Sequence, residues 1–174
     1  MQTNYPVHFP QFFTATIYEW KHLLSNNQRK DTIIESLQFL VNDKRITLYA
    51  FVIMNNHIHL IWQPLFGFSP SDVQASFMKY TAQQLKRSLA GSDTNTLAAL
   101  KVNKYDRTYQ VWKREPLSVE LRTHAVFMQK LDYVHDNPVR AGLCIHPEDY
   151  YYSSAKFYYG GIDHFKMITH FSGN

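Results

Sequence analysis

The sequence predicts an α+β domain of the ferredoxin-like (split βαβ) type, in which helices pack on one face of an antiparallel sheet. The order of patterns along the chain is strand, helix, strand, strand, helix, strand, helix. Hydrophobic residues make up 45% of the chain and charged residues 18%, which is typical of a folded core. Because 174 residues suit one domain, we expect residues 1–174 to form a single unit with a tyrosine-rich tail from about residue 145 to 174.

The first three elements follow from side-chain pattern. Residues 12–18 are aromatic and β-branched, which favours a strand. Asp31 can cap a helix whose apolar residues recur at helical spacing until Asn42 and Asp43 end it. Residues 46–54 are apolar on both alternating faces and predict a buried central strand.

A hairpin is expected next. Asn55 and Asn56 interrupt the apolar run, and Asn tolerates a positive φ better than most residues. A two-residue turn there returns the chain antiparallel through residues 57–63, and Pro64 ends that strand.

The second half contains two clear helix signals. Ser69 and Pro70 mark the start of a helix that should run to about Leu89, with Gly91 closing it. The polar residues 91–108 predict a long loop with up to one turn of helix, and residues 109–114 predict a further strand.

The last helix should begin at Thr123 and end at Asn137. Its end is predicted from Pro138, because the residue before a proline is pushed out of the α conformation.

Composition narrows the function classes. The net charge of +4 permits nucleic acid as a partner without demanding it. Cys144 is the only cysteine, which excludes an internal disulfide and a cysteine-rich zinc site. With no secretory signal and no long apolar run in the sequence, we expect a cytoplasmic protein that does not engage a membrane.

Two histidines are candidates for chemistry. His57 and His59 are two residues apart on an expected strand, so both imidazoles point to the same face and can form a two-ligand metal site. Ile58, Leu60 and Trp62 on the reverse face would anchor that strand in the core. A hydrogen-bonded or surface pair is the alternative that these residues leave open.

Tyr133 and Asn137 form the second candidate pair. They are four residues apart on the last helix and therefore share a face. A phenol and an amide oxygen there can serve as a nucleophile and as a ligand for a hard divalent ion, respectively. The alternative is a packed tyrosine and an Asn that ends the helix.

Two segments carry a resemblance to a known family. Residues 56–60 read Asn-His-Ile-His-Leu, and residues 131–143 read Leu-Asp-Tyr-Val-His-Asp-Asn-Pro-Val-Arg-Ala-Gly-Leu. Together with the early Phe-Phe-Thr strand and the late Tyr-Ser-Ser-Ala segment, they resemble the IS200-like single-tyrosine transposases with a His-hydrophobic-His motif. The resemblance is greatest to the branch associated with repetitive extragenic palindromes (REP).

The resemblance implies a role for each candidate. His57, His59 and Asn137 would bind a divalent metal, Mg²⁺ or Mn²⁺, and Tyr133 would attack DNA to give a covalent 5′-phosphotyrosine. The implied partner is single-stranded DNA with a hairpin, bound in a bacterial cell close to the nucleoid. Both a monomer and a homodimer with exchanged tyrosine helices are compatible with the sequence.

Basic side chains offer a phosphate track for such a substrate. The candidates are Lys79, Lys86, Arg87, Lys113, Arg114 and Arg140. Two other functions stay open. One is a replication-initiator or relaxase-like nickase, which shares the histidine strand and tyrosine chemistry, and the other is a non-catalytic ferredoxin-like nucleic-acid-binding module.

Overall fold

The computed structural model describes residues 8–172. Its strands are β1 (Gln11–Thr16), β2 (Ile46–Ile53), β3 (His57–Pro64), β4 (Lys101–Lys104), β5 (Arg107–Tyr109) and β6 (Leu117–Glu120). Its α-helices are α1 (Asn27–Asn42), α2 (Pro70–Ser92), α3 (Thr94–Ala99), α4 (His124–Arg140) and α5 (Ala155–Gly160). Short 3-10 turns lie at Tyr18–Trp20, Leu23–Ser25 and Pro147–Asp149.

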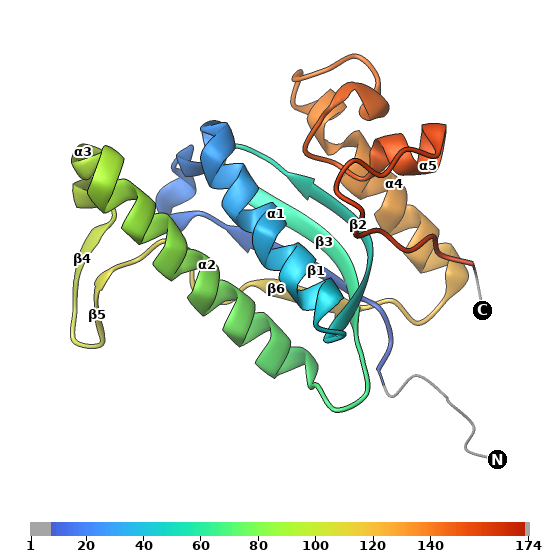
Figure 1. Cartoon of the computed structure of the whole chain (residues 1–174), viewed down its shortest axis with the longest axis horizontal. Coiled ribbons are helices and arrows are strands. Elements are labelled where there is room, and N and C mark those ends of the chain that lie inside the picture. Colours follow the sequence, from blue (N-terminus) through green and yellow to red (C-terminus); the bar gives the residue numbers. More distant parts are fainter. Residues whose placement is uncertain (1–7, 173–174) are drawn as a thin grey trace.

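The central sheet has four antiparallel strands in the order β2-β3-β1-β6 (Figure 1). Strand β3 is central, paired with β1 on one side and β2 on the other. The βαββαβ connection and this strand order confirm the predicted ferredoxin-like class.

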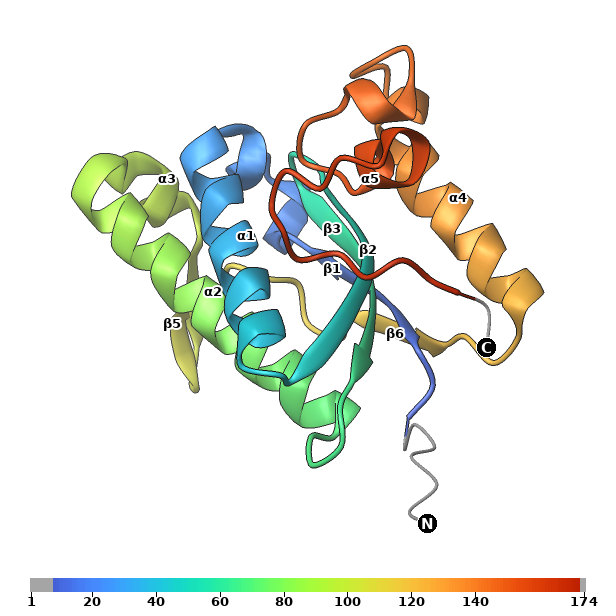
Figure 2. The same cartoon turned by 45° about the vertical axis from the view of Figure 1, so that its right-hand side comes forward.

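Helices cover both faces of this sheet (Figures 1 and 2). On the α1 and α2 side, Ile58, Leu60 and Trp62 are buried in the larger core, as expected. On the opposite side, α4 packs Phe127 and other apolar residues against the sheet in a second core. The expectation of helices on one face therefore holds for α1 and α2 but omitted α4.

Helix α1 begins earlier than predicted. Asn26 is its N-cap, with a side chain that accepts a hydrogen bond from the Gln28 backbone N–H. Asp31 lies inside the helix instead of capping it, and its carboxylate accepts a 2.8 Å hydrogen bond from the Tyr152 hydroxyl.

Helix α2 starts as predicted, with Ser69 at the N-cap and Pro70 in the first turn. Gly91 does not close it, because the helix continues to Ser92. Asp93 ends α2 and caps α3, where its side chain accepts from the Thr96 N–H.

The predicted loop 91–108 is right only in its short helical turn, and the predicted strand 109–114 is wrong. The first contains α3 and strands β4 and β5, which form a hairpin that projects beside α3 (Figure 1). In the second, Trp112 makes a single bridge to Ile17. The fourth strand of the sheet is instead β6, whose four residues are all exposed and therefore lack the buried pattern of a strand.

Helix α4 starts at its predicted cap, Thr123, but continues through Pro138 to Arg140. Pro138 is buried in the last turn, where the preceding residues still have helical partners. The proline bias at Asn137 is overridden because burial and terminal hydrogen bonds, such as Leu143 N–H to the Pro138 carbonyl, stabilise the helical turn.

Backbone contacts define the turn between β2 and β3 and the position of the tyrosine-rich tail. The Asn55-Asn56 hairpin is confirmed, although neither residue has a positive φ. In the tyrosine-rich tail, Ser153 bridges to Val52 on β2, so this segment packs along the sheet.

Within residues 8–172, no helix has the length and hydropathy needed to span a membrane.

Candidate active site

The two histidines lie on the α4 side of β3. Strand register places Thr14 of β1 opposite His59 and Thr16 opposite His57. The two ring centroids are 4.8 Å apart, as the two-residue spacing predicts. This face is covered by α4, which brings the other candidate residues towards the pair.

His59 is fixed and has one nitrogen without a partner. Its Nδ1 lies 2.7 Å from the Thr14 hydroxyl oxygen. Its Nε2 is buried and makes no hydrogen bond in the described part of the chain. A buried polar atom without a partner is costly, so an external group that binds Nε2 would remove this penalty.

His57 contacts Asn56 and lies beside Asn137. Its Nδ1 lies 2.7 Å from the side-chain oxygen of Asn56, which accepts the ring proton. The Asn137 side chain lies beside the His57 ring and favours the charged form of that imidazole. Asn137 therefore meets the histidine pair, although it comes from a helix about eighty residues further along the chain.

Tyr133 is the second α4 residue that reaches the pair. Its ring centroid is 5.2 Å from that of His59 and 5.9 Å from that of Phe12. The side chain is 37% exposed, so solvent or a substrate can reach it. Because Asn137 is one turn further along α4, the predicted shared face is present.

Two cations flank the tyrosine ring. Lys130 Nζ lies 5.6 Å and Arg140 Cζ 5.7 Å from the Tyr133 ring centroid. The sequence had indicated Arg140 but not Lys130. The sequence does contain a signal for Lys130. It lies three residues before Tyr133, and this spacing places both side chains on one helix face.

Burial disfavours the charged form of both imidazoles. Burial lowers the pKa of His59 to about 3, and the nearby His57 and Lys130 add to this. Burial also lowers the pKa of His57, and the nearby Asn137 side chain partly opposes this shift. Neutral imidazoles are the form that binds metals.

The candidate donor atoms fit a divalent ion that accepts both nitrogen and oxygen ligands. They comprise two imidazole nitrogens and one amide oxygen, which together suit Mn²⁺, while Mg²⁺ prefers oxygen alone. Within residues 8–172, no group of three His, Cys, Asp or Glu side chains could hold a metal. Asn137 is an amide residue that lies beside His57.

His135 lies on α4 between Tyr133 and Asn137 but points away from the site. It is buried, and its Nε2 lies 2.8 Å from the Ser154 hydroxyl. Burial lowers its pKa to about 4. These contacts give His135 a structural role in joining α4 to the tail.

The predicted basic residues divide into three groups. Lys79, Lys113 and Arg114 line one groove between α2 and the segment that precedes β6. Lys86 and Arg87 lie further along α2, outside that groove. Arg140 alone lies beside Tyr133.

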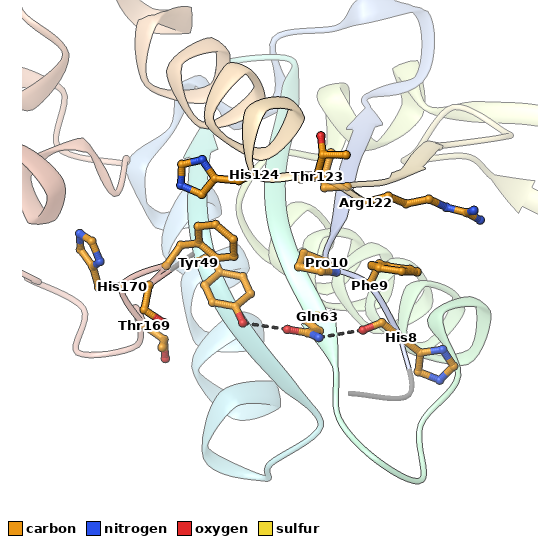
Figure 3. A pocket seen from close by; sticks show the side chains of 13 residues that line it. His8, Phe9, Pro10, Tyr49, Gln63, Arg122, Thr123, His124, Thr169 and His170 are labelled. Atoms are coloured by element: carbon orange, nitrogen blue, oxygen red, sulfur yellow. Dashed lines mark hydrogen bonds between the residues drawn. The ribbon is translucent and has the colours of Figure 1, made fainter. Parts of the chain in front are cut away.

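A separate pocket of about 600 Å³ lies at the other end of β3 (Figure 3). Gln63 accepts a 2.7 Å hydrogen bond from Tyr49 and donates one of 2.7 Å to the His8 carbonyl. None of the predicted site residues lines this pocket.

The fold and the site together define a class of protein. It is a ferredoxin-like domain in which a histidine pair on the central strand lies next to a tyrosine on a packed helix. The sequence matches the family model described as "Transposase IS200 like" over residues 11–126, about two thirds of the chain. The protein belongs to this family, and its function is that of a transposase that cleaves DNA. The match contains both histidines and ends before Tyr133.

One solved structure shares this fold along the whole chain. A REP-associated tyrosine transposase bound to a REP hairpin aligns with a TM-score of 0.64 at 18% identity, covering 100% of this chain and 96% of its own. A transposase-like chain from Deinococcus radiodurans R1 aligns with a TM-score of 0.47 at 12% identity, covering 78% and 98%. No curated protein matches the sequence significantly.

Proposed function

We propose that the protein is a metal-dependent transposase and endonuclease that cleaves and rejoins single-stranded DNA near hairpins through Tyr133. The observation that carries this proposal is the approach of Tyr133, 5.2 Å between ring centroids, to His59, whose buried Nε2 has no partner. A binding module without chemistry does not need this arrangement. The family match favours a transposase over a replication nickase.

The proposed metal ligands are His57, His59 and Asn137, and the proposed ion is Mg²⁺ or Mn²⁺. A bound divalent ion would polarise the scissile phosphate and offset its negative charge. Thr14 and Asn56 orient the two rings so that each Nε2 carries the lone pair, provided that each Nδ1 donates its proton.

Tyr133 is the proposed nucleophile. Its phenolic oxygen forms a bond to phosphorus while the bond from phosphorus to the 3′ oxygen breaks. The phenol loses its proton and the departing oxygen gains one, which leaves a 5′-phosphotyrosine and a free 3′-hydroxyl. Lys130 and Arg140 supply positive charge beside the ring for the phosphate. Attack by another 3′-hydroxyl reverses the step and rejoins DNA.

The proposed substrate is hairpin-bearing single-stranded DNA, and the proposed branch is the REP-associated one. A structural relative that shares the fold along the whole chain is bound to a REP hairpin. We place this activity in the bacterial cytoplasm, near the nucleoid.

The tyrosine acts in its own chain in this proposal. Tyr133 and His59 of one chain are already in contact, so an exchange of helices between two copies is not needed. Mixing His59→Ala with Tyr133→Phe protein tests this point. We expect no activity from the mixture, whereas restored cleavage would show that the site is shared between chains.

The test of the function is a covalent adduct. The protein is incubated with a labelled palindromic hairpin and Mn²⁺, denatured and separated by gel electrophoresis. We expect a labelled protein band that disappears with EDTA and in Tyr133→Phe, His57→Ala and His59→Ala.

Tyr159→Phe is the matched control, because Tyr159 is also exposed but lies on α5. It should form the adduct normally. A wild-type protein that binds the hairpin without forming an adduct would favour the binding module. An adduct that persists in Tyr133→Phe would show that another residue is the nucleophile.

A further inference from the structure

A basic groove of about 700 Å³ lies outside the site of chemistry, between α2 and the segment 107–116. Lys79 from α2 faces Arg107, Lys113 and Arg114 from the other wall, and Glu115 is the only acidic residue among those that line it. Arg107 and Arg114 each pair with Asp106, which holds both guanidinium groups at the surface. Exposed ion pairs are weak, so a phosphate can compete for these groups.

The groove begins close to the candidate active site. The Lys113 backbone N–H donates a 2.7 Å hydrogen bond to the Thr16 carbonyl, and Thr16 is the cross-strand partner of His57. The Lys113 side chain extends over the exposed Trp20 ring, and its Nζ lies 5.9 Å from the ring centroid. Lys113 therefore belongs to the groove and also lies at the end of the sheet where His57 begins β3.

Trp20 is linked to His57 through one side chain. The Asn56 amide lies 3.5 Å from the Trp20 carbonyl, while its oxygen contacts His57 Nδ1. Glu19 and Trp20 both have positive φ, 54° and 55°, a conformation that is unfavourable for residues with a side chain. This backbone leaves a large apolar ring 57% exposed beside the site.

We propose that this groove holds the single-stranded DNA that flanks the cleaved phosphate. The strand leaves the active site across Trp20, where a base stacks on the indole, and its phosphates then follow Lys113, Arg114 and Lys79. This inference rests on the proposed function, because it takes the cleaved DNA strand as the ligand. In this proposal Lys86 and Arg87, which lie outside the groove, do not contact the DNA.

The size of the effect follows from counterion release. For single-stranded DNA, log K falls with log salt by about 0.7 per phosphate contact. Removing three contacts should lower this slope by about 2 and weaken binding about 100-fold at 0.1 M salt. Loss of one stacked base should weaken binding about tenfold.

The experiment measures DNA binding separately from cleavage. All variants carry Tyr133→Phe, and the probes are a labelled hairpin with a single-stranded dT tail on either side and the same hairpin without tails. The groove variant combines Lys79→Gln, Lys113→Gln and Arg114→Gln. The control variant combines Lys44→Gln, Lys86→Gln and Arg87→Gln, which removes the same charge outside the groove.

We expect the groove variant to lose about 100-fold in affinity for a tailed hairpin, with little change for the hairpin without tails. Equal losses in both triple variants, or none in the groove variant, would overturn the proposal. Because Tyr133→Phe removes cleavage from every measurement, this result is independent of whether wild-type protein forms the covalent adduct.

A second measurement tests the stacking position. A 2-aminopurine placed near the hairpin in the tail should lose fluorescence on binding to protein with Trp20 or with Trp20→Phe, and keep it with Trp20→Leu. Circular dichroism checks that the three proteins are folded alike. Equal quenching by Trp20→Leu would remove Trp20 from the proposed path.

Discussion

Replacing Thr14 by Val tests whether His59 is oriented for metal binding. The Thr14 oxygen lies 2.7 Å from His59 Nδ1, and Nε2 is buried without a partner. If Nδ1 donates its proton to Thr14, Nε2 is free to bind a metal. Val has nearly the same shape as Thr but removes the acceptor, so His59 loses the contact that selects this tautomer.

The magnitude follows from the loss of this one contact. Removing a partner that orients a metal-binding histidine costs about 10- to 100-fold in affinity, or about 1.4–2.7 kcal/mol. A buried ring nitrogen left without a partner also lowers the free energy of unfolding of the metal-free protein by about 1–3 kcal/mol.

Calorimetric titration with Mn²⁺ measures the first effect and urea unfolding without metal measures the second. Thr14→Ser is the control, because it keeps the hydroxyl and should retain most of the affinity. A Thr14→Val protein that binds Mn²⁺ within twofold of the wild type would refute the role assigned to Thr14. Absence of Mn²⁺ binding in the wild type would refute the metal site itself.

Three further predictions concern stability. Ser154→Ala removes the partner of the buried His135 Nε2 and should lower the free energy of unfolding, measured with urea, by about 1–3 kcal/mol. An unchanged free energy of unfolding would contradict this role of Ser154. Phe127→Ala should cost about 3–5 kcal/mol, because Phe127 is buried in the core beneath α4; a loss below about 1 kcal/mol would contradict that packing. Asp93 has a pKa of about 2, lowered chiefly by hydrogen bonds from Thr96, so its contribution is present above about pH 4 and is lost as the pH falls towards 2. Thermal unfolding from pH 5 to 2 should show a smaller acid loss in Asp93→Asn than in the wild type, and parallel curves would contradict this.

The sequence predicted those parts of the fold in which side-chain pattern and burial agree. The buried run that forms β2 and the cap at Ser69 are confirmed. Strand β6 could not be found in this way, because all four residues are exposed and the strand is defined by pairing with β1. Likewise, burial of Pro138 overrides the local bias against helix, and only the tertiary structure shows that burial.

The sequence indicated which candidate residues come together, whose roles stay predictions, but not the side chains that surround them. Spacing alone places His57 and His59 on one face, and the structure brings Asn137 and Tyr133 to them. The role of Thr14 depends on strand register, which the sequence does not specify.

The most direct test of the central claim is to locate the covalent bond. The protein is reacted with the hairpin and Mn²⁺, the DNA is digested to a short nucleotide remnant, and tryptic peptides are sequenced by mass spectrometry. We predict a 5′-phosphonucleotide on Tyr133 alone. A remnant on another residue, or unmodified Tyr133 in protein that has cleaved the DNA, would contradict the proposed mechanism.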